Sequence, residues 1–204
     1  RLSGPYSGRL SFSGFFNDAA LQEHAALKGL PTADVIATFL ISTTLGQAAC
    51  GLIGKQVGYG WDRGADGSLA IKTEIQSNDG ATGLQWGLSL TAGKRTDTTA
   101  TNGASVDFLT GSTTFGAVFY LEVFAFTGTS VTVAIQESSD DGAGDPYAAV
   151  TGGAFTAVSS APTAQRIQTI LTQTVERYLR AVTTGTFTNA QFAVVAKRYA
   201  AAGG

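Results

Sequence analysis

Residues 55–78 read KQVGYGWDRGADGSLAIKTEIQSN, and this stretch decides how the rest of the chain is interpreted. Two strand-like runs flank the turn sequence DRGADG at residues 62–67. Asp-Gly between such runs is a strong β-hairpin signal, because glycine accepts the positive φ that the turn requires. The sequence therefore predicts a long hairpin over residues 53–78.

The return arm of this hairpin alternates between two kinds of side chain. Its odd-numbered positions from 69 to 75 carry apolar side chains and one threonine, whereas its even-numbered positions are mostly charged or polar. Successive side chains of a strand point to opposite faces, so the pattern predicts one dry face and one wet face. The residues expected on the wet face are Lys72, Glu74 and Gln76, and those expected to pack beneath are Leu69, Ile71 and Ile75.

The composition is typical of an all-β protein. The chain has 204 residues, of which 26 are glycine, and only 14% of its residues are charged. Many glycines and short side chains suit tight turns and exposed strand faces. The formal net charge is −2 and no run of Lys or Arg occurs, so no basic surface is expected to hold nucleic acid.

Residues that could support catalysis or bind a metal are scarce. The single cysteine, Cys50, excludes an internal disulfide and a multi-cysteine zinc site, and its apolar surroundings predict a buried side chain. The single histidine, His24, lacks clustered ligands or a nominated nucleophile, so we interpret it as a packing residue. We expect no cofactor and no enzymatic activity.

The only acidic cluster lies at residues 138–145. It lacks the alternating ligand spacing and the closing glutamate of an EF-hand loop. We interpret it as a solvated turn, with a weak calcium site as the alternative.

Shorter elements are expected around the hairpin. Asn17 and Asp18 can cap a helix over residues 18–28, and residues 34–44 read as a buried strand. Residues 91–103 are polar and lack periodicity, which predicts a long loop. We expect this loop to contact a neighbouring subunit, and the residues proposed for that contact are Lys94, Arg95 and Asp97.

From about residue 115 the pattern changes to closely spaced strands. Residues 117–126 and 131–137 are expected to face each other across a turn at 127–130, as in a β-sandwich. We therefore predict a first β domain over residues 1–112 and an outer β-sandwich domain over residues 113–204. The residues expected to face inward are Val131, Val133 and Ile135, together with either Leu179 and Ala181 or Tyr178 and Val182, depending on register.

The larger aromatic side chains allow two interpretations. Tyr59 and Trp61 share one strand, and Trp86 lies on another. Exposed, they could form a sugar-stacking platform. We interpret them as core residues, because large side chains at alternating positions usually point inward.

The remaining sequence-level features concern membranes and the start of the chain. No apolar run approaches the roughly 18 residues of a membrane span, so no membrane partner is expected. The chain begins at Arg1 and contains no methionine, so we expect an N-terminal segment to precede it.

The order of these features resembles that of the major tail tube protein of tailed bacteriophages, in the form that actinobacterial phages carry with an extra C-terminal β-sandwich. The resemblance covers most of the chain and rests on sequence patterns in both halves. In the first half these are GPYSGRLSFSGFFNDA at 4–19, DVIATFLIS at 34–42 and SLAIKTEIQSNDGATGLQWG at 68–87. In the second half they are FTGTSVTVAIQESSD at 126–140, GGAFTAV at 152–158 and ERYLRAVTTGTFTNAQFAV at 176–194.

The resemblance implies a structural virion protein of the phage tail. Its subunits would close into hexameric rings that stack into a hollow tube, with the wet face of the hairpin lining the lumen. The implied partners are further copies of the chain, the tape-measure protein and the tail-terminator protein, with DNA only in transit. The alternative is a capsid- or tail-decorating β-sandwich module that binds glycans.

Overall fold

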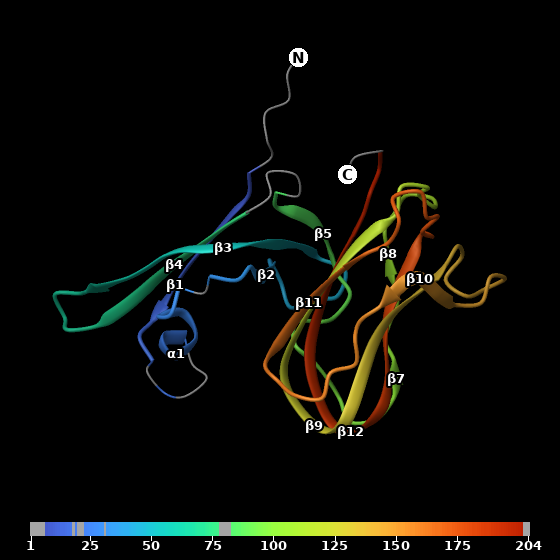
Figure 1. Ribbon diagram of the computed structural model, residues 1–204. Coiled ribbons are helices and arrows are strands. Elements are labelled where there is room, and N and C mark those ends of the chain that lie inside the picture. Colours follow the sequence, from blue (N-terminus) through green and yellow to red (C-terminus); the bar gives the residue numbers. More distant parts are fainter. Residues whose placement is uncertain (1–6, 18, 20–22, 31, 78–82, 202–204) are drawn as a thin grey trace, which may run out of the picture. The chain divides into compact units, whose positions relative to one another are not determined.

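The computed structural model describes residues 7–17, 19, 23–30, 32–77 and 83–201. Strands dominate these residues, which confirms the expected all-β class with one short helix (Figure 1). In the first half of the chain the elements are β1 (Arg9–Phe15), α1 (Glu23–Leu27), β2 (Val35–Leu40), β3 (Ala48–Arg63), β4 (Leu69–Ser77) and β5 (Gln85–Ser89). In the second half they are β6 (Arg95–Asp97), β7 (Thr101–Asn102), β8 (Val106–Asp107), β9 (Ala117–Ser138), β10 (Ala148–Ala154), β11 (Thr163–Gln168) and β12 (Tyr178–Arg198).

The chain divides into two compact units. The first unit holds residues 1–37 and 52–85, and the second holds residues 38–51 and 86–204. This division differs from the expected boundary between residues 112 and 113. Strands β6, β7 and β8 all pair with β12, which is why the residues before 113 belong to the second unit.

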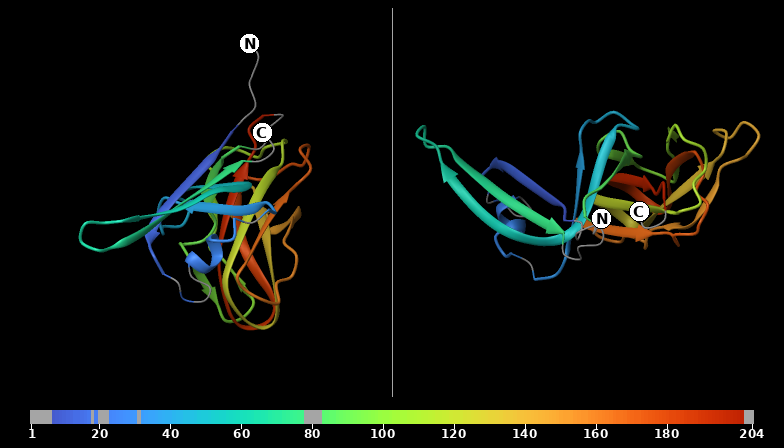
Figure 2. Two further views of the ribbon diagram at one scale, coloured as in Figure 1. Left: turned by 60° about the vertical axis from the view of Figure 1, so that its left-hand side comes forward. Right: turned by 90° about the horizontal axis from the view of Figure 1, so that it is seen from above.

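The first unit is organised around the expected hairpin. Strands β3 and β4 pair antiparallel, with Arg63 opposite Leu69, and β1 pairs antiparallel with the other edge of β4. The turn closes through the Gly64 amide, which donates to the Ser68 carbonyl at 2.8 Å. The hairpin prediction is therefore confirmed, and Figure 2 shows β3 and β4 running side by side as a curved ribbon to their tip.

Two elements near the hairpin are shorter than expected. Helix α1 covers Glu23–Leu27 rather than residues 18–28, of which residues 18 and 20–22 lie outside the described part of the chain. Strand β2 ends at Leu40, and the chain turns back after Ile41, whose amide donates to the Ala48 carbonyl at 3.2 Å.

The second unit is built on its two longest strands, β9 and β12, which pair over almost their whole lengths. The sequence predicted a turn at 127–130 between two strands, but the structure has one strand that bends there (Figure 1). A Cβ on Gly128 would lie 2.4 Å from the Phe187 Cα, so only glycine allows the two strands to approach this closely at the bend. The two halves of one sheet thus form the two layers that were expected from separate strands.

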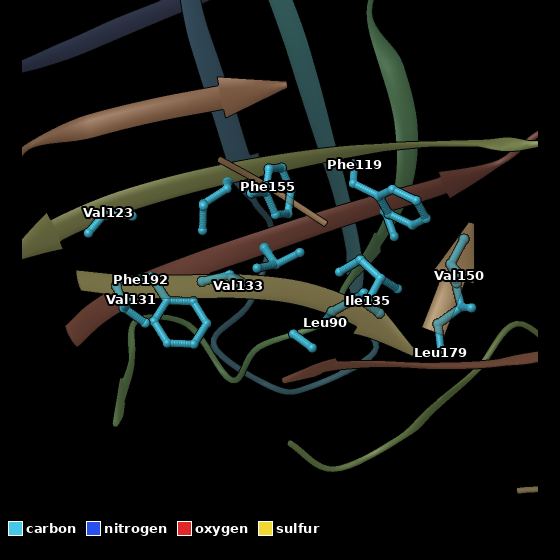
Figure 3. Close-up of a cluster of buried hydrophobic side chains, with 14 of the residues drawn as sticks. Leu90, Phe119, Val123, Val131, Val133, Ile135, Val150, Phe155, Leu179 and Phe192 are labelled. Atoms are coloured by element: carbon cyan, nitrogen blue, oxygen red, sulfur yellow. The ribbon is translucent and has the colours of Figure 1, made fainter. Parts of the chain in front are cut away.

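The core of the second unit lies between these two halves. Val131, Val133 and Ile135 are buried, as predicted, and in Figure 3 they lie on the segment facing the one that carries Phe119 and Val123. The register left open by the sequence is settled. The residues of β12 that join this core are Leu179 and Ala181, whereas Tyr178 and Val182 lie outside it.

Residues 91–103 are not the irregular loop that the sequence predicted. They contain β6 and β7, which pair with Ala190–Phe192 and with Val182 and Thr183 of β12. Strands of two or three polar residues carry no detectable period, so the sequence pattern could not show them.

Candidate assembly surface

The three-stranded sheet β1–β4–β3 has two chemically different faces. On β4, Ile71, Thr73 and Ile75 are buried, whereas Lys72 and Gln76 are exposed. Glu74 is half-buried on the same face as Lys72. The structure thus separates the side chains by face as the alternation predicted, with Leu69 half-buried near the turn.

Helix α1 covers the dry face. The Gln56 side chain donates to the Leu27 carbonyl at 2.8 Å, and the His24 Nδ1 and Tyr59 Oη atoms form a hydrogen bond of 2.6 Å. The His24 ring also lies 4.8 Å from the Phe16 ring, between centroids. His24 is therefore a packing residue that fixes the helix to the sheet, as expected from the sequence.

The charges of the wet face occur as opposite pairs. Glu74 pairs with Arg9 at 3.5 Å, and Lys72 pairs with Asp62. A third pair joins Lys55, which is opposite Gln76 in the register, to Asp34 at 2.8 Å. Three cations and three anions therefore balance one another along the sheet.

The wet face also forms an open trough of about 560 Å³. Gly58 and Gly60 leave space for this trough because they carry no side chains. A Cβ at either position would meet open space. Ser11 and Ser13 are opposite Glu74 and Lys72 in the register, and all four residues line the trough. The residues between the charged side chains on this face are thus glycines and serines.

The outer edge of β1 is open. Among the described strands only β4 pairs with it. The Ser77 amide donates to the Gly8 carbonyl at 2.8 Å, and the Phe16 amide to the Leu69 carbonyl at 2.9 Å, so the even-numbered positions bond to β4. Because antiparallel pairing alternates, the backbone groups of odd-numbered residues such as Ser13 point away from β4.

The end of β3 offers a second open edge. Hydrogen bonds from Ile41 to Ala48 and from Ser89 to Gln47 place β2 and β5 beside the beginning of β3. Of the described strands, only β4 lies beside residues 57–63. Because β1 and β3 are both antiparallel to β4, these two open edges run in the same direction.

The two tryptophans do not belong to the core, so that interpretation was wrong. Trp61 is 64% exposed and Trp86 is 49% exposed. Trp61 contacts Tyr59 edge to face, with ring centroids 6.2 Å apart, while Tyr59 in turn contacts His24 of α1. In the described part of the first unit the helix reaches Tyr59 and leaves Trp61 uncovered near the hairpin tip.

The residues expected in the inter-subunit loop lie in the second unit and are largely engaged there. Arg95 and Asp97 form a bidentate ion pair at 2.7 and 2.8 Å, with side chains only 14% and 4% exposed. Asp97 also accepts a hydrogen bond from Thr183, and Arg95 donates to the Ala181 carbonyl. Of the three, only Lys94 remains exposed, with its Nζ 5.6 Å from the centroid of the Phe124 ring.

Cys50 and the acidic stretch at residues 138–145, which the sequence analysis also considered, have structural roles. Cys50 is a free, buried cysteine, as predicted, and burial raises the pKa of its thiol. In the acidic stretch, Asp140 accepts hydrogen bonds from the Gly144 and Asp145 amides, so its carboxylate closes the turn. Within the described residues no group of three or more His, Cys, Asp or Glu side chains is arranged to hold a metal ion.

A scan against protein-family models and a search of curated proteins both gave no match. In the described residues no helix has the length and apolar character needed to cross a membrane.

Proposed function

We propose that this chain is a self-assembling structural subunit whose three-stranded sheet forms part of the wall of a water-filled ring. The observation that carries the proposal is one sheet with a dry face, a wet face and two open edges that run in the same direction. Unpaired edges attract further strands, and closure of a barrel removes them. If β1 of one copy pairs with the end of β3 of the next, all wet faces point to the same side.

The tail tube of a tailed phage is the assembly that best fits this geometry and the resemblance described above. In that role the chain would form stacked hexameric rings in the virion, with the tape-measure and tail-terminator proteins as partners. Lys72, Glu74 and Gln76 would line the lumen. The balanced charges of the wet face support passage of DNA, because a surface without excess cations offers no phosphate-binding field.

The open edge of β1 provides a direct test. Ser13→Pro removes an amide that points away from β4, so it blocks a new strand without breaking the β1–β4 ladder. Ser13→Ala is the matched control, since it keeps the amide. We expect the alanine variant to form rings and tubes in electron microscopy and the proline variant to remain a folded monomer in sedimentation. Assembly of the proline variant as efficient as that of the alanine variant would reject edge pairing through β1.

A glycan-binding or decorating module is the second candidate, and the exposure of Trp61 and Trp86 favours it. Exposed tryptophan rings are suited to stacking on sugars, since one face is apolar and available. In this case the protein would remain monomeric and bind glycans on an array, and Trp61→Ala or Trp86→Ala would abolish binding. Rings without glycan binding would exclude this candidate.

A further inference from the structure

Trp61 and Gly14 lie on the dry face of the three-stranded sheet, each beside one of its two open edges. In the register, Ile71 of β4 is opposite both of them, with Gly14 on β1 and Trp61 on β3. Trp61 is largely exposed, and a Cβ added to Gly14 would meet open space. A large apolar ring and an empty position therefore lie at opposite edges of the same face.

Gly14 occupies the interior of β1 without a local reason for glycine. It does not have the positive φ that other side chains avoid. Glycine inside a strand weakens that strand and often marks a place where another group approaches closely. An aromatic side chain on a neighbouring strand can offset such a glycine by covering it. Gly14 is thus a position that a side chain from a further strand can cover.

The backbone groups at the open edge of β3 alternate, as those of β1 do. The Gly64 amide donates to the Ser68 carbonyl at 2.8 Å, so the even-numbered residues near the hairpin tip bond to β4. The backbone groups of Tyr59 and Trp61 therefore point to the open edge. These two residues have side chains on the dry face. On β1 the residues with outward backbone groups, such as Ser13, have side chains on the wet face.

This difference between the two edges decides how they can pair. In an antiparallel ladder, residues with outward backbone groups lie opposite each other, so dry-face residues of β3 would meet wet-face residues of β1. In a parallel ladder, a residue with outward groups lies beside one whose groups point away, and the two side chains share a face. Parallel pairing of β3 with β1 of a second copy therefore keeps both faces continuous, and the two edges run in the same direction.

Two registers satisfy this rule with the longest overlap of the open edges. One places Trp61 beside Gly14, and the other moves it along β1 to Phe12, where a ring already occupies the dry face. The first register brings the exposed ring to the empty position, so we favour it. On the wet face, the same register places Gly60 beside Ser13.

We propose that the indole ring of Trp61 in one copy covers Gly14 of the next copy, within a parallel ladder between β3 and β1. This contact rests on the proposed ring assembly and gives its interface a register and an anchor. Helix α1 leaves Trp61 exposed in the single chain because the surface that covers this ring belongs to a second copy. Tryptophans that become buried at an interface commonly dominate its binding energy.

Disulfide trapping between copies tests the register. Gly60→Cys and Ser13→Cys would be prepared as two separate variants, mixed and oxidised under assembly conditions. Both new side chains fit the free chain, since Ser13 is exposed and a Cβ on Gly60 meets open space, whereas the native Cys50 is buried. The mixture should form covalent dimers, because register partners on neighbouring strands lie within reach of a disulfide. Neither variant alone should do so.

Ser11→Cys is the matched control for this trapping. It lies on the same face of β1 as Ser13, two residues along the strand. Mixed with Gly60→Cys, it should give at least about fivefold fewer covalent dimers than Ser13→Cys gives. Equal trapping would overturn the register. Dimers of Ser13→Cys alone would mean that β1 pairs with β1 in a twofold dimer, which would also overturn the proposal.

Gly14→Val and Trp61→Ala test the anchor. Valine fits the free chain because its Cβ meets open space, but it occupies the place of the ring from the next copy. Each variant should raise the concentration required for assembly by at least about tenfold. Trp86→Ala, which changes an exposed tryptophan of the second unit, should leave that concentration unchanged. Light scattering over a dilution series measures assembly, and circular dichroism checks the fold. Assembly of Gly14→Val at the wild-type concentration would overturn the contact.

Failure of this contact differs from failure of the ring. If Ser13→Ala forms rings, Gly60→Cys does not trap Ser13→Cys and Trp61→Ala assembles normally, the ring stands and the contact is wrong. If neither the wild type nor Ser13→Ala forms rings, the proposed function fails, and the contact fails with it.

Discussion

Phe119 and Phe124 lie on the same strand, β9, in opposite environments. Phe119 is fully buried in the core of the second unit, whereas Phe124 is 45% exposed. Phe119→Ala leaves a cavity, so it should lower the free energy of unfolding by about 3–5 kcal/mol. Phe124→Ala should lower it by less than about 1 kcal/mol, because its side chain is already partly in water. Urea unfolding of both variants checks this difference, and equal losses would contradict the core assignment.

Asp97 and Asp62 show how burial changes the contribution of an ion pair to the stability of the protein. Asp97→Asn leaves the Arg95 guanidinium buried without its counter-ion, which should destabilise the protein by about 3–5 kcal/mol. Asp62→Asn removes the solvent-exposed partner of Lys72 and should change stability by less than about 1 kcal/mol. Thermal unfolding at one pH compares the two variants. A small effect of Asp97→Asn would mean that this ion pair and its hydrogen bonds to Thr183 and Ala181 do not hold β6 on β12.

At the scale of elements, we expect the loop after β9 to respond to pH through Glu176, which lies just before β12. Burial and a hydrogen bond to Asp145 raise the pKa of the Glu176 carboxyl to about 7. A carboxyl group whose pKa is raised in the folded state contributes stability at low pH, and this contribution is lost as pH rises through the folded pKa. Stability should therefore decline between about pH 4.5 and pH 7. Glu176→Gln should reduce this decline in urea unfolding at several pH values, and an unchanged profile would contradict the assignment.

The elements also show which parts of the fold the sequence could predict. The β3–β4 hairpin was predictable because the Asp66-Gly67 turn signal is followed directly by a strand in which apolar and polar side chains alternate. The bend of β9 was not, because Gly128 with its threonine neighbours has the composition of a turn. Strands β6 and β7 were missed because their pairing with β12 depends on a distant segment of the chain.

The candidate assembly surface was predicted only in part. The alternation on β4 identified the wet and dry faces, since side-chain direction in a strand follows from sequence alone. It could not show the open edges, which depend on where other strands end. The exposure of Trp61 was missed for a related reason, because the sequence does not tell how far helix α1 covers the dry face.

For the molecule as a whole, the central claim is that copies of β1 and β3 pair to enclose water. Cryo-electron microscopy of the assembled full chain tests this most directly. We expect closed rings in which β1 of one copy runs beside β3 residues 57–63 of the next, with Lys72, Glu74 and Gln76 facing the channel. A map in which the β1 edge is free in a monomer, or in which these three side chains face away from the channel, would contradict the account.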